Sequence, residues 1–240
     1  MENMEINGVE TAEARRYDTL ALSPEVMGAL QNKGYEVATP IQSGCIPFLM
    51  DDQDVVAKAP TGTGKTYAFG IPIVEHTDPE GTDVTSLILA PTRELALQIR
   101  DDLRELSALK KGVRVVCLYG GQPIDKQVNQ LKKKPQIVVA TPGRLMDHKK
   151  RRTIRLDKVQ TVILDEADRM LDMGFIDDVT KILDMMPNRK NLGLFSATIS
   201  REVMDISWVY QRDPAEITVR PVNEDRPDIQ QYRLELDSRE

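Results

Sequence analysis

The strongest chemical signal in the sequence is a glycine-rich run that ends in a lysine and a threonine. The run reads Ala59-Pro60-Thr61-Gly62-Thr63-Gly64-Lys65-Thr66, after an apolar segment and before a helical pattern. In such a turn, backbone N–H groups and the start of the following helix hold phosphate oxygens. Lys65 can then reach the β- and γ-phosphates of a nucleotide, and the Thr66 hydroxyl can bind Mg²⁺. The run predicts a phosphate-binding loop, although Ala59 replaces the usual first glycine.

A second signal is the acidic run Asp165-Glu166-Ala167-Asp168, which directly follows the apolar residues 161–164. In an α/β sheet the carboxyl end of a strand lies at the ligand-binding edge. Mg²⁺ prefers carboxylate and water oxygens, and hydrolysis needs a base near the attacking water. Asp165 therefore suits the metal and Glu166 suits the water. Acidic residues also balance the helix dipole at a helix start, but the nearby phosphate-binding loop favours the catalytic interpretation.

Short apolar segments that alternate with helical patterns must position these two runs. The expected strands are apolar on both faces, as in strands buried between two helical layers, and cover residues 54–59, 86–90, 113–119, 136–140, 161–165, 192–196 and 215–219. Between them, residues 92–109 place Leu95, Ile99, Leu103 and Leu106 along one helical stripe. The pattern predicts an α/β fold with a mostly parallel sheet and helices on both faces.

Composition and length exclude several classes of protein. With 240 residues, of which 40% are hydrophobic and 29% charged, the chain is expected to fold as a globule. Cys45 and Cys117 lie in apolar segments and His76 and His148 lack partners at metal-ligand spacing, so we expect reduced buried thiols and no zinc site. Neither a spanning segment nor a secretory signal is evident. We therefore expect a cytoplasmic monomer without membrane contact.

Three units are expected along the chain. Residues 1–16 are polar and predict a flexible segment, and residues 17–219 hold the α/β pattern. Residues 220–240 begin with two prolines among mixed charges and then alternate like a strand, so they predict a linker and the start of a second domain. Trp208, Tyr210 and the methionines at 170, 173, 185 and 186 are expected in the core or on partly buried helix faces.

Charge is distributed unevenly. The net charge is −6, yet residues 110–155 contain thirteen lysines and arginines against two acids, a local charge of +11. A basic run is often only a solvated surface, but this contrast favours an edge that faces a polyanion.

Together with five further motifs, the two runs resemble the DEAD-box family of ATP-dependent RNA helicases, in order and spacing and over nearly the whole chain. Gly34-Tyr35-Glu36-Val37-Ala38-Thr39-Pro40-Ile41-Gln42 resembles the adenine-sensing motif, with Tyr17 at the position of its upstream aromatic residue. Pro91-Thr92-Arg93-Glu94-Leu95-Ala96, Gly120-Gly121 and Thr141-Pro142-Gly143-Arg144 resemble the RNA-backbone motifs, and Ser196-Ala197-Thr198 resembles the coupling motif. Two residues depart slightly from the usual family motif, since Tyr17 replaces a phenylalanine and Ala38 replaces a proline.

The resemblance implies a RecA-like P-loop domain that uses ATP and Mg²⁺. It assigns ATP binding to Tyr17, Gln42, Thr61, Gly62, Thr63, Gly64, Lys65 and Thr66, with Thr66 and Asp165 on the metal and Lys65, Asp165 and Glu166 in catalysis. It assigns RNA-backbone binding, without base preference, to Pro91, Thr92, Arg93, Gly121, Thr141, Gly143 and Arg144. It also implies that Ser196 and Thr198 hydrogen-bond toward Asp168 and transmit nucleotide state to the RNA side.

Several of these residues also have a local structural interpretation. Gln42 fits the third position of a capping box begun by Thr39, while its carboxamide also matches the N6 amine and N7 of adenine, on which Tyr17 can stack. Thr92 and Thr141 likewise fit helix N-caps.

Hydrolysis in this family needs arginines from a second RecA-like domain, and no His-Arg-x-Gly-Arg string occurs here. These residues alone are therefore expected to bind nucleotide and RNA but to be nearly inactive. Two alternatives stay open, a P-loop NTPase that acts on a protein or on DNA, and a non-catalytic RNA-binding domain.

Overall fold

The central element of the fold is a seven-stranded parallel sheet. The computed structural model describes residues 14–219. The strands are β1 (Val55–Lys58), β2 (Ser86–Leu89), β3 (Val115–Leu118), β4 (Ile137–Ala140), β5 (Thr161–Asp165), β6 (Asn191–Ser196) and β7 (Ala215–Thr218). Their order across the sheet is β3-β4-β2-β5-β6-β1-β7, and every strand pairing is parallel. Each expected strand is present within two residues of its expected ends, so the predicted fold class is confirmed.

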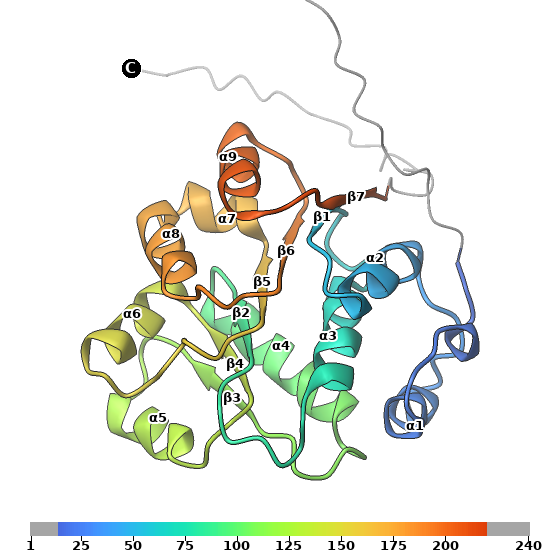
Figure 1. Cartoon of the computed structure of the whole chain (residues 1–240), viewed down its shortest axis with the longest axis horizontal. Coiled ribbons are helices and arrows are strands. Elements are labelled where there is room, and N and C mark those ends of the chain that lie inside the picture. Colours follow the sequence, from blue (N-terminus) through green and yellow to red (C-terminus); the bar gives the residue numbers. More distant parts are fainter. Residues whose placement is uncertain (1–13, 220–240) are drawn as a thin grey trace, which may run out of the picture.

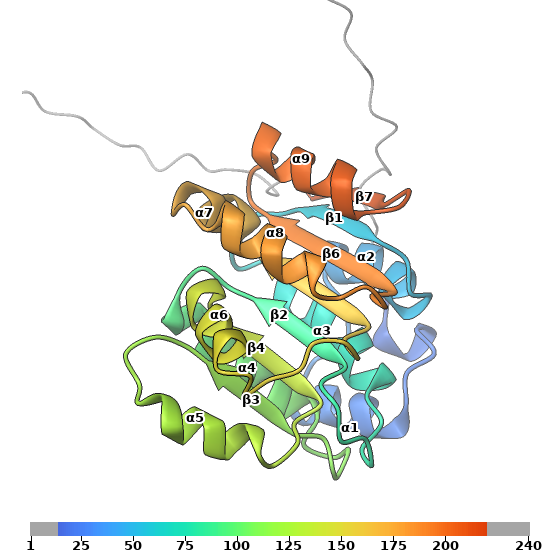
Figure 2. The ribbon, with the colours of Figure 1, turned by 60° about the vertical axis from the view of Figure 1, so that its left-hand side comes forward.

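Helices cover both faces of this sheet (Figures 1 and 2). One layer holds α1 (Pro24–Asn32), α2 (Pro40–Met50), α3 (Lys65–His76) and α4 (Arg93–Leu106). The other holds α5 (Ile124–Leu131), α6 (Pro142–Lys150), α7 (Ala167–Asp172), α8 (Ile176–Asp184) and α9 (Arg201–Tyr210). Successive strand residues point to opposite faces, so Val55 and Ala57 pack in the first core and Val56 packs in the second.

The start of α4 illustrates how the sequence defines a helix. The Thr92 side chain accepts a hydrogen bond from the Leu95 N–H at 3.3 Å, which satisfies one of the free donors of the first turn. Ile99, Leu103 and Leu106 are then buried against the sheet, as the helical stripe predicted.

The folded unit begins before Tyr17. Arg16 forms an antiparallel bridge with Val37, and the Ala38 N–H donates to the carbonyl oxygen of Arg15 at 2.7 Å. These contacts attach residues 15 and 16 to the domain expected from residue 17 onward, and the domain boundaries stay a prediction. The expected linker, residues 220–240, lies outside the described residues, as do residues 1–13.

Two predictions about the core are wrong. Trp208 is 70% exposed and Met173 is 49% exposed, whereas Met170 and Met186 are buried as expected. The buried stripe of α9 runs through Val203, Ile206 and Ser207, and helical geometry turns the next residue, Trp208, outward.

Tyr210 and Met185 are half-buried, as expected. Cys45 and Cys117 are buried free thiols, as also expected. Among the described residues no helix has the length and apolar character needed to cross a membrane.

Candidate functional site

Six of the seven motifs follow the carboxyl ends of strands, and the strand order sorts these six into two groups. Strands β5, β6 and β1 are neighbours, and they end in the acidic run, in residues 196–198 and in the phosphate-binding loop. Strands β3, β4 and β2 are the other neighbours, and they lead to residues 120–121, 141–144 and 91–93. Along the chain the phosphate-binding loop comes first, the three motifs of the second group follow, and the acidic run and residues 196–198 come last. Strand pairing alone therefore separates two groups of motifs, which we name the nucleotide half and the RNA half of the edge after the roles expected of them.

In this structure, side chains of the phosphate-binding loop hydrogen-bond to the backbone of the same loop. Lys65 is only 7% exposed, and its Nζ donates to the carbonyl oxygen of Ala59 at 3.2 Å. The Thr63 hydroxyl donates to the carbonyl oxygen of Pro60 at 2.8 Å. Gly64 has a φ of +92°, and a Cβ there would lie 2.5 Å from Nε2 of Gln42. Glycine is thus required at this position both for its backbone conformation and for the close approach of Gln42.

A cleft of about 600 Å³ opens beside this loop. Its walls include Thr61, Gly62, Gly64, Lys65 and Thr66 from the loop and Asp165 and Glu166 from the acidic run. The cleft thus joins the two strongest sequence signals. Tyr35 and Tyr67 also line it and contact each other edge to face, with ring centroids 5.5 Å apart. Sequence reasoning missed these two tyrosines, although Tyr35 belongs to the adenine-sensing motif.

Gln42 makes three hydrogen bonds that fix its carboxamide. Its Oε1 accepts from the N–H of Thr39 at 2.8 Å, so the predicted cap is present. The same oxygen accepts from the Tyr17 hydroxyl at 2.6 Å, and Nε2 donates to the carbonyl oxygen of Gly64 at 3.0 Å. The residue therefore links α2 to the phosphate-binding loop, a contact that sequence reasoning did not foresee. Its role toward adenine stays a prediction.

Tyr17 does not present the stacking surface that was expected of it. The residue is 2% exposed and belongs to the core beneath α1 and α2, and this burial raises the pKa of its hydroxyl. A buried phenol needs a partner for its O–H, and Gln42 supplies that partner. In this conformation Tyr17 contacts Gln42, and its role toward ATP stays a prediction.

The acidic run places one carboxylate in the interior. Asp165 is 3% exposed, and burial raises its pKa to about 6, although the Lys65 charge and a hydrogen bond from the Glu166 N–H at 3.0 Å oppose the shift. Glu166 is half-buried at a φ of +49°, and its Oε2 pairs with Arg169 at 3.2 Å. A buried carboxylate with a high pKa is a group that a bound cation would stabilise in its charged form.

The donor set of the cleft fits Mg²⁺ that arrives with a nucleotide. Among the residues described, no group of three or more His, Cys, Asp or Glu side chains could hold a metal. Mg²⁺ does not need one, because it keeps several waters and binds through one or two carboxylates and phosphate oxygens. Asp165 and Thr66 both line the cleft and offer the oxygens that this mode requires.

Asp168 joins the ends of β5 and β6. Its Oδ2 accepts hydrogen bonds from the backbone N–H and the hydroxyl of Thr198, each at 2.8 Å. Its own N–H donates to the Ser196 hydroxyl at 3.2 Å. Burial favours the neutral acid, but these bonds outweigh it and lower the pKa of Asp168. The hydrogen bonding expected among these three residues is thus confirmed.

In the RNA half, Arg93 and the glycine pair lie together. The Arg93 guanidinium sits 4.9 Å from the centre of the Tyr119 ring, and Gly121 has a φ of +83°. Pro91 is buried and therefore shapes the turn, whereas Arg93 and Gly121 are exposed. A phosphate group bound here would contact the Arg93 guanidinium and the exposed backbone at Gly121.

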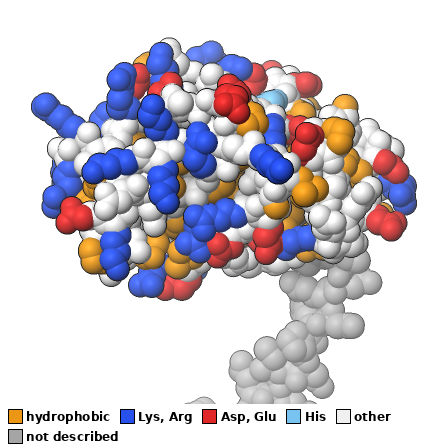
Figure 3. All heavy atoms as spheres, turned by 90° about the horizontal axis from the view of Figure 1, so that it is seen from below, with side chains coloured by type: hydrophobic (Ala, Val, Ile, Leu, Met, Phe, Trp, Pro, Cys, Tyr) orange, Lys and Arg blue, Asp and Glu red, His pale blue; other side chains and the backbone are white. Residues whose placement is uncertain are grey.

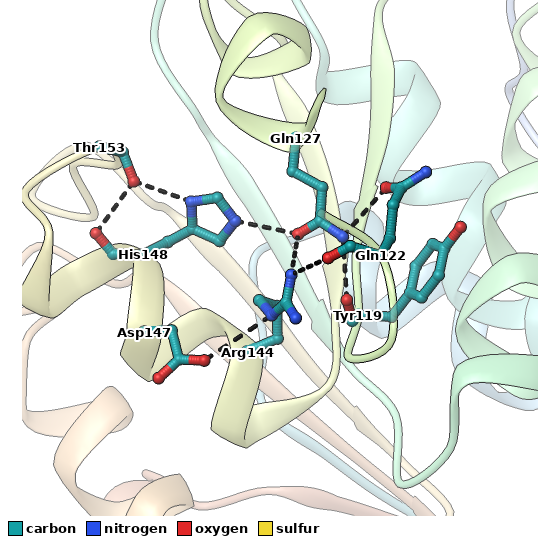
Figure 4. Close-up of polar contacts among 7 residues, drawn as sticks. All are labelled: Tyr119, Gln122, Gln127, Arg144, Asp147, His148 and Thr153. Carbon is teal, nitrogen blue, oxygen red and sulfur yellow. Dashed lines mark hydrogen bonds and ion pairs between the residues drawn. The ribbon is translucent and has the colours of Figure 1, made fainter. Parts of the chain in front are cut away.

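The third RNA motif begins α6. Thr141 is the N-cap residue of α6, as expected, but its side chain, unlike that of Thr92, makes no cap hydrogen bond. Gly143 and Arg144 follow in the first turn, both half-buried. The Arg144 Nη1 donates to the carbonyl oxygen of Gln122 at 2.8 Å, which connects α6 to the glycine pair (Figure 4).

Most of the basic segment 110–155 lies elsewhere. Apart from Lys126 and Arg144, its basic residues are in the last turn of α6 or in the segments that lead to the amino ends of β3, β4 and β5. The Arg114 Nε donates to the carbonyl oxygen of Lys134 at 3.0 Å, which joins two of these segments. Figure 3 shows the side at the bottom of Figure 1, where Lys and Arg side chains gather. The charges and the RNA motifs are therefore neighbours in sequence but not in space.

Comparisons with known proteins agree with this site. A family model described as DEAD/DEAH box helicase matches residues 39–206. The chain is 46% identical over 220 residues to the DEAD-box ATP-dependent RNA helicase CshA of Geobacillus kaustophilus, covering 92% of this chain and 47% of that protein. The protein of the same name from Bacillus subtilis is 45% identical over 218 residues, covering 91% and 44%. The chain thus spans about half the length of the curated relatives it matches.

A solved structure supports the same relationship. The crystal structure of a DEAD box protein from Methanococcus jannaschii superposes with a TM-score of 0.82 at 42% identity, covering 85% of this chain and 56% of that one. The predicted RecA-like fold is therefore confirmed. Because the family model, the full-length relatives and the arrangement of motifs at the sheet edge coincide, the chain belongs to the DEAD/DEAH box helicase family.

Proposed function

We propose that this chain is the ATP- and RNA-binding RecA-like domain of an ATP-dependent RNA helicase. The observation that carries the proposal is the sorting of six motifs along one sheet edge into a nucleotide half and an RNA half. The two halves adjoin where β2 lies beside β5, so the acidic run is next to the turn that holds Arg93. Such adjacency suits an enzyme in which nucleotide and RNA influence each other's binding.

The proposed hydrolytic roles follow from the lining of the cleft. Lys65 leaves the Ala59 carbonyl and binds the phosphates, while Thr66 and Asp165 hold Mg²⁺, which neutralises charge on the phosphate oxygens when bound. Glu166 orients the attacking water and accepts its proton. Phosphoryl transfer relies mainly on positioning and on stabilisation of charge in the transition state. In this proposal, arginines of a second RecA-like domain of the same polypeptide supply part of that stabilisation.

RNA is bound through its backbone in this proposal. Arg93 and Arg144 supply charge, while Gly121, Thr141 and Gly143 offer open main chain or hydroxyl groups. No base-reading pocket is assigned, so affinity does not depend on sequence. Asp168, through Ser196 and Thr198, communicates between the nucleotide and RNA sides. The protein acts as a cytoplasmic monomer.

Two binding experiments test the proposal. ADP titration of wild type and Lys65→Ala should show a loss of affinity in the variant. Titration of several unrelated RNA single strands at increasing salt should show the same decline in affinity for each strand. Tight binding of one strand only, or an affinity that does not change with salt, would contradict backbone recognition.

Hydrolysis separates this proposal from its rivals. With the second RecA-like domain present, RNA should stimulate ATP turnover. Stimulation by DNA or a protein alone would favour the other P-loop NTPase class, and no turnover with intact ATP binding would favour a non-catalytic RNA-binding domain.

A further inference from the structure

A buried polar cluster lies behind the RNA half of the edge, and its centre is Gln127 of α5 (Figure 4). Gln127 is 0% exposed, and its carboxamide is fully used. Nε2 donates to the carbonyl oxygen of Tyr119 at 2.9 Å and to Oε1 of Gln122 at 3.1 Å. Oε1 faces Nε2 of His148 at 3.0 Å and Nη1 of Arg144 at 3.4 Å. The Gln127 carboxamide thus contacts the residues on both sides of Gly120-Gly121, and it also contacts the first and last turns of α6.

The partners fix the orientation of this amide. A carbonyl oxygen only accepts, so the Tyr119 contact requires the nitrogen of Gln127 on that side and its oxygen toward His148. The His148 Nε2 must therefore carry a hydrogen. Its Nδ1 lies 2.8 Å from the Thr153 hydroxyl, which holds the other side of the ring. Burial and the nearby Arg144 charge lower the pKa of His148, in accord with a neutral ring.

Arg144 lies at the outer end of this cluster, with its side chain 14% exposed. Its Nη1 is held by the carbonyl oxygen of Gln122 at 2.8 Å, and its Nε lies 3.7 Å from Asp147. Within residues 14–219 its Nη2 donates no hydrogen bond. The guanidinium is therefore held along one side and retains a free N–H₂ group for a phosphate oxygen.

We propose that Gln127 and His148 are positioning residues for RNA binding, because they lock Arg144 and the Tyr119–Gln122 turn into one rigid phosphate-binding unit. This inference rests on the proposed RNA-binding function. Neither residue touches RNA. A flexible arginine side chain loses much rotamer freedom when it binds, and a guanidinium fixed in advance has less freedom to lose. Sequence reasoning missed both residues, since neither lies in a recognised motif.

The decisive experiment is a double-mutant cycle between Gln127→Met and Arg144→Ala, read by RNA single-strand titration over a range of salt concentrations. Methionine nearly preserves the volume of glutamine but makes none of its hydrogen bonds. Each single variant should weaken RNA binding about tenfold, the value of one hydrogen bond to a charged group. In the Arg144→Ala background, Gln127→Met should cost less than about twofold, because both changes remove the same contact.

The salt dependence distinguishes positioning from general destabilisation. The plot of log K against log salt has a negative slope, and loss of one phosphate contact to a single strand makes it shallower by about 0.7. Gln127→Met should make the slope shallower by this amount although it removes no charge. Gln130→Met, on the same helix, is the control, because the Gln130 side chain makes no hydrogen bond within the described part of the chain. It should leave RNA affinity and slope unchanged.

ADP affinity confirms that each variant is folded and should stay within about twofold of wild type, since the nucleotide half lies on other strands. If Gln127→Met fails to bind ADP, the same cycle is made with His148→Phe. If the losses of RNA affinity in the cycle are additive, or if Gln127→Met or His148→Phe keeps the wild-type salt slope, the inference is overturned while the proposed RNA-binding function stands. If Arg144→Ala binds RNA as wild type does, the proposed role of Arg144 fails first and the inference fails with it.

Discussion

The side-chain Nε2 of Gln42 donates a hydrogen bond to the carbonyl oxygen of Gly64 at 3.0 Å, and so joins the start of α2 to the phosphate-binding loop. The opposite end of the carboxamide is held by Thr39 and Tyr17. Adenine would need one donor and one acceptor from this carboxamide; Nε2 keeps a second N–H, but Oε1 already accepts two hydrogen bonds. Nucleotide binding through Gln42 therefore requires Oε1 to exchange one of its two partners.

Gln42→Glu tests this exchange. Glutamate keeps an acceptor for the Thr39 N–H but places a second acceptor against the Gly64 carbonyl, so the free energy of unfolding should fall by about 1 kcal/mol. ADP binding should weaken by about 1–3 kcal/mol, because an ionised carboxylate cannot donate to adenine and repels the phosphates. Urea unfolding and ADP titration measure the two effects.

Gln31→Glu is the control for charge, since Gln31 is exposed on α1. It should change neither quantity. If Gln42→Glu binds ADP as tightly as wild type, Gln42 is only a cap and a loop contact.

Glu166→Gln should slow ATP hydrolysis by about 10²–10⁴-fold in the protein with its second domain, because an amide cannot accept the proton from water. ATP affinity should stay close to that of wild type. Single-turnover hydrolysis with RNA present is the measurement. Asp102→Asn makes the same chemical change elsewhere in the cleft and should keep the rate within about threefold. Equal rates for Glu166→Gln and wild type would remove Glu166 from the mechanism.

Asp165 predicts a pH dependence of stability in the absence of nucleotide and metal. Its pKa is raised to about 6 in the folded chain from its usual 3.8, so the unfolded chain loses this proton first as the pH rises. This contribution to the free energy of unfolding is full below pH 3.8 and is lost as the pH rises through about 6. Asp165→Asn should remove this loss and be more stable than wild type by about 2–3 kcal/mol at pH 7.

Urea unfolding of both proteins across pH 4 to 7, with a chelator present, measures the difference. The exposed Asp172→Asn serves as the control and should follow wild type. A constant difference between Asp165→Asn and wild type over the whole range would show that the Asp165 pKa is not raised.

The location of the basic segment predicts which lysines matter for RNA. Lys132 and Lys133 precede β4 at the amino edge, and a four-residue strand of about 13 Å separates them from the RNA motifs. At 0.15 M salt the Debye length is about 8 Å, so their charge is largely screened there. Replacing both by alanine should change RNA affinity less than about twofold, whereas Arg93→Ala with Arg144→Ala should lower it at least tenfold.

Both pairs remove the same formal charge, so RNA titration at one salt concentration compares them directly. Equal losses would show that total charge, rather than position at the carboxyl edge, determines RNA binding.

Local patterns in the sequence determined the elements and the motifs. Apolar runs defined every strand to within two residues, and Thr92 marked the start of α4, because burial between two helical layers and helix capping are local requirements. The phosphate-binding loop and the acidic run were recognisable because their residue types directly determine their chemistry.

Only the tertiary structure decided which motifs share a site. Parallel strands are paired over long distances in sequence, so the order β3-β4-β2-β5-β6-β1-β7 brought Asp165 beside the loop of Lys65 and placed the motifs of Arg93 and Arg144 after the neighbouring strands β2 and β4. The buried contacts of Tyr17 and of Gln127 depend on residues far along the chain. No local pattern encodes such contacts, because a buried polar group takes whichever partners packing supplies.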